Sequence, residues 1–321
     1  MEKPGDKPGK RGKRPLKRKP KELRAEPMVF SISDSGAGPV LQALGRGTKA
    51  AAKAATRGSG APGETDDAGE TVPLEQSDDP VEDAVRERAR QIAARLSLHR
   101  PAHGHGARRG AGELVSVRYR EGADDIDLDR TLEVLAEKPF PEDEDIIVRE
   151  RVRRRRSVEL VVDVSGSMKG ERIRTAAATV GALAAELGND DVGVIAFWSD
   201  VSILLPMGKA FVAQTLLDDL LKLPAKGLTN VGFPLQVAAA ELARRPNPEA
   251  RVLLLSDCVH NAGPDPRGPA AALPRLDVLL DASGEKDEQL GRELAAIGHG
   301  RMFTVRDHRQ VAPALSQIFR S

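Results

Sequence analysis

The chain has 321 residues and nearly balanced charge, with 49 Lys and Arg against 48 Asp and Glu, and its only cysteine is Cys258. One cysteine excludes an intramolecular disulfide, and no stretch approaches the roughly 18 continuous apolar residues of a membrane-spanning helix. The basic N-terminus lacks the apolar segment of a secretory signal peptide. We therefore expect a cytoplasmic protein with no membrane partner, folded as one large domain or two smaller ones.

Charge is strongly segregated near the start of the chain. Residues 1–24 carry eleven basic residues against three acidic ones, whereas residues 58–85 carry nine acidic residues and no Lys or Arg. Charge blocks with few large apolar side chains usually stay solvated, so residues 1–77 are predicted to form a disordered, charged tail. The basic block has the charge to contact phosphates, but it lacks aromatic residues for stacking on bases, which argues against nucleic acid as a partner.

Residues 78–151 are predicted to form a lead-in region that packs on the domain after it. Apolar residues recur at spacings of three and four from Val81 to Leu96, which indicates an amphipathic helix. The hydrophobic pattern then predicts two strands and, between them, a helix: Glu113–Tyr119, Asp145–Val152 and Asp124–Lys138.

From residue 152 onward, short apolar runs alternate with amphipathic helical patterns, which is typical of βαβ units and a parallel sheet. One strand, Val201–Leu205, is expected to pair antiparallel with the strand before it. For residues 152–321 we therefore predict an α/β fold with a doubly wound, mostly parallel sheet, one antiparallel edge strand and helices on both faces.

The first strand of this region, Val158–Val162, ends in a run of oxygen-bearing side chains. Asp163, Ser165 and Ser167 follow it within five residues. Gly166 lets the backbone turn sharply between the two serines. In an open α/β sheet ligands bind beyond the carboxyl ends of the strands, and oxygen donors there suit a hard divalent cation. One carboxylate and two hydroxyls cannot complete the near-octahedral shell of Mg²⁺, so further donors must come from elsewhere.

Two later residues are candidates for the missing donors. Thr229 lies in a glycine-bearing loop before a predicted helix, and Asp257 follows the apolar strand Arg251–Leu255. The strand order of a doubly wound sheet can bring both beside Asp163. Taken singly, each of these residues is an ordinary turn or cap residue, but together they predict a metal site.

The pattern D-x-S-x-S, followed by a loop threonine and a strand-end aspartate, resembles the von Willebrand factor A domain over residues 152–321. The resemblance implies a metal-ion-dependent adhesion site for Mg²⁺ or Mn²⁺, formed by Asp163, Ser165, Ser167, Thr229 and Asp257. It implies that both serines bind the ion directly, that the aspartates bind directly or through water, and that the threonine joins when the site is engaged. A carboxylate from a partner protein would fill the open position. Cys258 stands where the family usually has glycine, which puts the backbone of the third loop in question.

A second, narrower family resemblance bears on which protein is the partner. Residues 126–133, Leu204–Pro206 and Gly227–Thr229 are similar to the magnesium chelatase D subunit and its CoxE-like relatives. This resemblance implies work with an AAA+ ATPase of the MoxR or chelatase I type. The ATPase-like module of the D subunit has no counterpart here, so we expect a stand-alone adaptor with a separately encoded ATPase.

The sequence contains no catalytic motif that we can identify. The segment Val164–Gly166 lacks the leading glycine of a nucleophile elbow, His260 has no matching nucleophile, and the phosphate-binding pattern G-x-x-x-x-G-K-[ST] does not occur. We therefore expect a protein that is not an enzyme. Three hypotheses stay open: an adaptor for a MoxR-type ATPase in chaperone-like or metal-insertion assembly, a component of a magnesium or cobalt-type chelatase, and a nucleic-acid-associated protein.

Overall fold

In the computed structural model, the described residues are 16, 19–23, 25–35, 38–46, 71–73, 87–95, 113–119, 125–138, 142–152, 155–164, 171–187, 190–210, 212–223 and 228–319. Within them, one large sheet contains the strands β1 (Met28–Ser35), β2 (Gly38–Arg46), β3 (Thr71–Pro73), β6 (Ser157–Asp163), β7 (Asp191–Phe197), β8 (Val201–Leu205), β9 (Ala250–Ser256), β10 (Leu276–Asp281) and β11 (His299–Val305). Their order across the sheet is β11-β10-β9-β6-β7-β8-β1-β2-β3. The strand predicted to carry the metal motif, β6, therefore lies in the interior of the sheet.

The inner strands are parallel and almost completely buried. β6 is parallel to β7 and β9, and β10 is parallel to β9 and β11. Every residue of β9 is buried, and so is every residue of β6 except Asp163, as expected for parallel strands covered on both faces. β8 runs antiparallel to β7, as predicted. The predicted fold class, a mostly parallel α/β sheet with an antiparallel strand, is confirmed.

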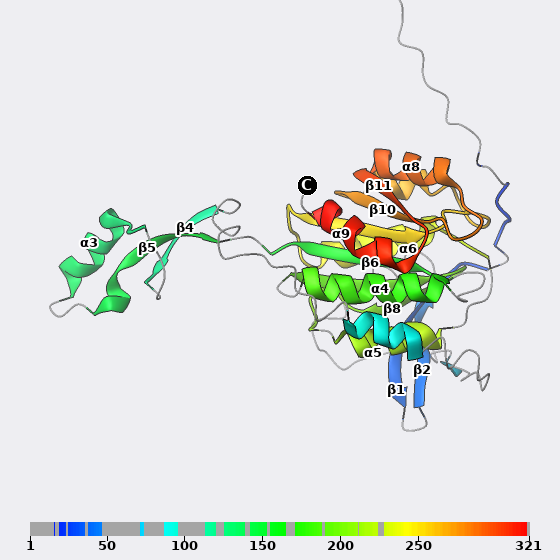
Figure 1. The fold of residues 1–321 in the computed structure, drawn as a ribbon, viewed down its shortest axis with the longest axis horizontal. Helices are drawn as coiled ribbons and strands as arrows, with labels where there is room; N and C mark the ends of the chain where they lie inside the picture. Colours follow the sequence, from blue (N-terminus) through cyan, green and yellow to red (C-terminus); the bar gives the residue numbers. More distant parts are fainter. Residues whose placement is uncertain are drawn as a thin grey trace, which may run out of the picture.

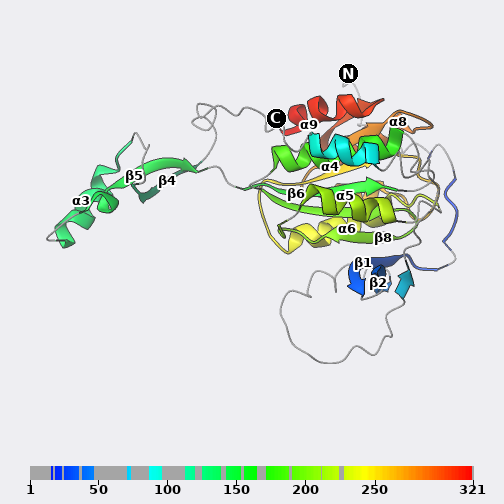
Figure 2. The ribbon, with the colours of Figure 1, turned by 60° about the horizontal axis from the view of Figure 1, so that its bottom comes forward.

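Helices cover both faces of the sheet (Figure 1 and Figure 2). One face carries the helix at residues 87–95, α4 (Glu171–Glu186), α5 (Ala213–Lys222) and α9 (Val311–Phe319), and the other carries α6 (Gly232–Ala243), α7 (Arg267–Ala271) and α8 (Glu288–Ile297). Successive side chains of β6 point to opposite faces of the sheet. Leu160 and Val162 pack in the hydrophobic core beneath the first set of helices, and Val161 packs in the core beneath the second set. Within the described residues, no helix has the length and apolar character that crossing a membrane requires.

The helix at residues 87–95 lies within a predicted amphipathic helix and packs against α4 through small side chains. Ala89 and Ala93 are fully buried in the core. A Cβ atom placed on Gly181 of α4 would lie 2.5 Å from the carbonyl oxygen of Ala93. Glycine at this position therefore permits the close approach of the two helices.

The structure differs from the sequence prediction for part of the N-terminal tail. The strands β1, β2 and β3 lie within the predicted disordered segment 1–77, yet they extend the sheet beyond β8. Val29 is fully buried, and the ring of Phe30 stacks on Trp198 with 6.2 Å between centroids. The short apolar run of β1 thus pairs with β8, a strand far away in the sequence. The division into a tail, a lead-in region at 78–151 and a domain at 152–321 stays a prediction.

A small unit contains β4 (Glu113–Arg118), α3 (Leu128–Glu137) and β5 (Ile147–Val152), where the sequence predicts two strands and a helix. β4 and β5 pair antiparallel, and Figure 1 shows the unit apart from the large sheet. Asp127 caps α3 by accepting a hydrogen bond from the backbone N–H of Arg130. Hydrogen bonds from Ser116 of β4 and Arg149 of β5 hold the pKa of Asp127 below its ordinary value. These bonds tie the helix to both strands.

The middle of β6 carries a buried carboxyl group, that of Glu159. Its side chain is fully buried, and neither carboxyl oxygen has a hydrogen-bond partner in the part of the chain that the structure describes. It lies over Gly193 of β7, where a Cβ atom would collide with it. Burial raises the pKa of Glu159 well above its ordinary value, and the nearby Glu241 carboxylate raises it further, whereas Arg244 acts in the opposite direction. The folded protein therefore favours the protonated form of Glu159.

Replacing Glu159 with glutamine is expected to change how stability depends on pH. Because its pKa is higher in the folded than in the unfolded chain, Glu159 contributes stability below pH 4.5 that is lost as the pH rises toward the folded value. Glu159→Gln should remove this loss and raise the free energy of unfolding at pH 7 by about 1 kcal/mol or more. Urea unfolding at pH 5 and pH 7.5 measures the difference, with exposed Glu249→Gln as control. An equal loss of stability at both pH values would contradict the expectation.

Candidate metal centre

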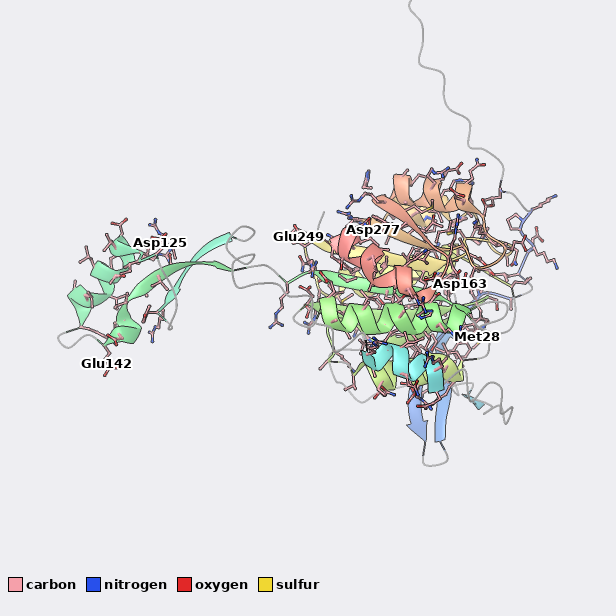
Figure 3. All side chains as sticks on the ribbon, viewed as in Figure 1. Met28, Asp125, Glu142, Asp163, Glu249 and Asp277 are labelled. Carbon is pink, nitrogen blue, oxygen red and sulfur yellow. The ribbon has the colours of Figure 1, made fainter. Side chains whose placement is uncertain are left out.

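Three neighbouring parallel strands end in acidic side chains at the same edge of the sheet. Asp163 closes β6, Asp257 directly follows β9, and Asp281 closes β10. β9 lies between the other two, with Val162 opposite Leu255 and Leu280 opposite Ser256. Figure 3 labels Asp163 at the far end of the sheet from Glu249, the residue just before β9. The carboxyl ends of the strands thus gather the acidic groups, as predicted for Asp163 and Asp257.

The three carboxylates share a small cavity of about 20 Å³. A cavity of this size has room for a single water molecule or a cation of similar size. The described residues that line it come from β6, α4, β9 with the loop after it, and β10: Asp163, Thr175, Ala176, Leu255, Ser256, Asp257 and Asp281. The lining therefore combines carboxylates and hydroxyls, the oxygen donors that suit Mg²⁺ and Mn²⁺.

Hydrogen bonds orient each of these carboxylates. The hydroxyl of Ser256 donates to Asp163 Oδ2 at 2.6 Å, which links the ends of β9 and β6. Backbone N–H groups donate to the other two: Val259 to Asp257 Oδ1 (2.9 Å) and Ser283 to Asp281 Oδ1 (2.8 Å). Within the described residues no group of three or more His, Cys, Asp or Glu is placed to hold a metal ion alone. Hydroxyl groups or water must therefore supply part of the coordination.

The third loop adopts a glycine-like backbone at Cys258. This residue has φ of 58°, in the left-handed region that glycine enters most readily. Its thiol is buried, and a Cβ atom on Gly291 of α8 would lie 3.2 Å from the sulfur. Burial raises the pKa of the Cys258 thiol well above its ordinary value, and the carboxylates of Asp257 and Asp163 raise it further. The substitution of the usual glycine thus leaves Asp257 on the cavity wall.

Thr229 is not among the described residues that line the cavity. Its backbone N–H donates to Asn261 Oδ1 at 2.7 Å, and its carbonyl oxygen accepts from the N–H of Asn261 at 3.1 Å. The N–H of Asn230 donates to the carbonyl oxygen of Trp198 at 3.0 Å. The threonine loop is therefore fixed to the loop after Asp257 and to the end of β7.

Ser165 and Ser167, the other two predicted ligands, lie outside the described residues. The structure thus brings Asp163 and Asp257 together on one cavity, and it joins the loop of Thr229 by hydrogen bonds to the loop that follows Asp257. The complete set of five ligands stays a prediction.

Three polar residues that line this cavity, Thr175, Ser256 and Asp281, were not among the predicted ligands. Ser256 and Asp281 had a usable signal, because each closes a mostly apolar strand in the same way as Asp163 does. Thr175 had none, since it lies within the pattern of a helix. His260, weighed and rejected as a general base, is buried and accepts a hydrogen bond at Nδ1 from the N–H of Val231 (3.3 Å). Burial lowers its pKa, so a structural role suffices for this histidine.

Residues 158–260 match the von Willebrand factor type A domain. The resemblance predicted from the D-x-S-x-S pattern is confirmed over this range, which is less than half of the chain. The matched part of the A domain begins in β6, ends at His260 and includes Asp163, Thr229 and Asp257. No curated protein matches the sequence.

Several solved structures are remotely similar to this chain. An aerotolerance-related membrane protein from Bacteroides fragilis is 20% identical with a TM-score of 0.44, and the similarity covers 51% of this chain and 98% of that one. A von Willebrand factor type A protein from Catenulispora acidiphila is 19% identical with a TM-score of 0.44, covering 53% and 43%. Proximal thread matrix protein 1 from the mussel byssus, with a zinc-occupied MIDAS motif, is 16% identical with a TM-score of 0.43, covering 51% and 47%. This chain thus spans less than half the length of the last two.

Proposed function

We propose that this chain is a divalent-metal-dependent protein-binding adaptor, not an enzyme, that works with a MoxR-type AAA+ ATPase in chaperone-like or metal-insertion assembly. The observation that carries the proposal is the cavity shared by Asp163 and Asp257 at the carboxyl edge of the sheet. Both carboxylates and the match to the A domain support a metal-ion-dependent adhesion site.

The groups around the cavity fit Mg²⁺ or Mn²⁺. Asp163 and Asp257, together with Ser165, Ser167 and Thr229, would hold the ion. The described lining residues include carboxylates and hydroxyls but no basic side chain that would compete with a cation. A bound ion would offer a coordination position to a carboxylate of the partner protein, which makes a strong charge-assisted contact. The residues of this chain fix the ion and leave that position to the partner.

A group of exposed apolar side chains at and just before the start of α3 is a second observation in favour of a protein partner. The side chains of Ile126, Leu128 and Leu132 are 49%, 65% and 63% exposed. They lie in the segment that is similar to the lead-in of chelatase D subunits, and Asp125 and Asp129 beside them are exposed as well. Exposed apolar side chains bordered by charge are typical of protein interaction sites. The matching surface on a partner would combine apolar and basic side chains.

A pull-down with the full chain as bait tests the proposal. In the presence of Mg²⁺ we expect an AAA+ ATPase of the MoxR type to be captured and identified by mass spectrometry. EDTA should release it, and excess Mg²⁺ should restore capture, because the partner's carboxylate needs the ion. Capture of the same ATPase with and without EDTA would refute metal-dependent binding. Recovery of a porphyrin-handling subunit instead would favour the chelatase hypothesis.

A further inference from the structure

Asp281 is part of the cavity although the D-x-S-x-S pattern does not include its strand. Its side chain is buried, with 7% of the residue exposed, and its Oδ1 accepts a hydrogen bond from the N–H of Ser283. The register between β9 and β10 places Leu280 opposite Ser256, so Asp281 and Asp257 are the next residues along neighbouring strands. Together with Asp163, they bring three carboxylates to one small space. Three carboxylates that line one small cavity favour a cation within it.

Thr175 gives a second and independent indication of a ligand in the same cavity. It is 1% exposed and lines the cavity from α4. Its hydroxyl has no hydrogen-bond partner within the residues that the structure describes. By contrast, Thr179, one turn further along α4 and also buried, donates its hydroxyl to the carbonyl oxygen of Thr175 at 2.8 Å. Since buried hydroxyl groups are nearly always hydrogen-bonded, the Thr175 hydroxyl is positioned for a water molecule or ion in the cavity.

We propose that Asp281 and Thr175 form an outer layer of the metal centre and hold water molecules bound to the divalent cation. This inference rests on the proposed metal site and goes beyond its five predicted ligands. An outer position follows because no group of three or more His, Cys, Asp or Glu in the described part of the chain is placed to enclose an ion directly. Mg²⁺ usually keeps several of its waters, and these need acceptors and donors in the protein. The carboxylate of Asp281 raises the affinity of the metal centre for the ion when no partner protein is bound.

The test is Mn²⁺ binding to the full chain, measured by the loss of the free-ion signal in electron paramagnetic resonance and by calorimetry. Asp281→Asn keeps an acceptor for the N–H of Ser283, so the fold should persist, but Mn²⁺ affinity should fall about 10- to 100-fold. Thr175→Val should weaken Mn²⁺ binding about fivefold, the equivalent of one hydrogen bond. The same variant should leave the metal-free protein at least as stable as the wild type, because an unsatisfied hydroxyl is removed. Thr179→Val, a buried threonine of the same helix, should keep wild-type affinity.

The outcomes separate this inference from the function it rests on. If the wild type binds no Mn²⁺ or Mg²⁺, the proposed metal site fails, and the outer layer fails with it. If the wild type binds Mn²⁺ and Asp281→Asn binds it equally well, the metal site stands and the role of Asp281 is refuted. A Thr175→Val variant with unchanged affinity but reduced metal-free stability would assign Thr175 to packing alone and remove it from the outer layer.

Discussion

Asp163→Ala is expected to abolish Mg²⁺ binding and, with it, the metal-dependent capture of a partner, while the fold stays intact. Asp163 closes the interior strand β6 and faces the cavity, so its carboxylate is the group from that strand closest to a bound ion. Losing a charged ligand of a divalent cation should reduce the affinity for the ion by at least the roughly 10- to 100-fold that the loss of an outer-shell partner costs. The backbone at this position is held by its pairing with Phe197 and by the hydrogen bond from the N–H of Val164 to the same residue (2.8 Å).

Two further variants make the test specific. Asp163→Asn retains an acceptor for the Ser256 hydroxyl, so any loss of Mn²⁺ binding in this variant reports the missing charge and not the missing hydrogen bond. Asp129→Ala removes an exposed aspartate of α3 and should bind Mn²⁺ as the wild type does. Thermal unfolding of the metal-free proteins checks the fold. Wild-type affinity for Mn²⁺ in Asp163→Ala would exclude Asp163 from the metal site.

The sequence predicts the large sheet well because burial on both faces leaves a simple pattern. The strands Val158–Val162 and Leu276–Leu280 are each apolar except for one acidic residue, Glu159 and Asp277, and each is followed by polar residues where the strand meets the surface. The same pattern locates Asp163 and Asp257, and it would have located Asp281 had it been applied to every strand. The sequence alone therefore predicts which edge of the sheet carries the site.

The remaining features depend on contacts between residues far apart in the chain. β1 and β2 lie between the two charge blocks of the N-terminal segment, in a stretch whose only charged residues are Asp34 and Arg46, and Phe30 of β1 contacts Trp198 only when the sheet is assembled. Glu159 is a charged residue type within an apolar strand, and a hydrophobic pattern alone does not tell whether such a side chain is buried. The structure shows that its carboxyl group is fully buried beside Gly193. The orientation of Thr175 toward a cavity is likewise set by packing, since nothing in a helical pattern distinguishes it from Thr179.

The run of four arginines at residues 153–156 is another feature whose environment depends on distant contacts. Taken alone, such a run is most simply expected to be exposed to solvent. The last of them, Arg156, is 4% exposed. Its Nε and Nη2 atoms donate to Asp190 Oδ2 at 2.9 and 2.6 Å, and its backbone N–H donates to Oδ1 of the same aspartate at 2.9 Å. The guanidinium also lies over the ring of Phe319, 4.9 Å from its centroid. One side chain thus joins the start of β6, the start of β7 and the end of α9.

Arg156→Ala is therefore expected to destabilise the protein by about 3 kcal/mol, because it leaves the Asp190 carboxylate, whose side chain is only 10% exposed, without its positive partner. Arg155→Ala, a change of the same chemistry at the exposed neighbouring residue, should alter stability by no more than about 0.5 kcal/mol. Denaturant unfolding of the two variants beside the wild type measures the difference. Arg156 lies at the opposite end of β6 from Asp163. The affinity for Mn²⁺ should therefore be unchanged in both variants when it is measured under conditions in which they are folded. Equal, small losses for the two arginines would mean that the ion pair with Asp190 does not stabilise the fold.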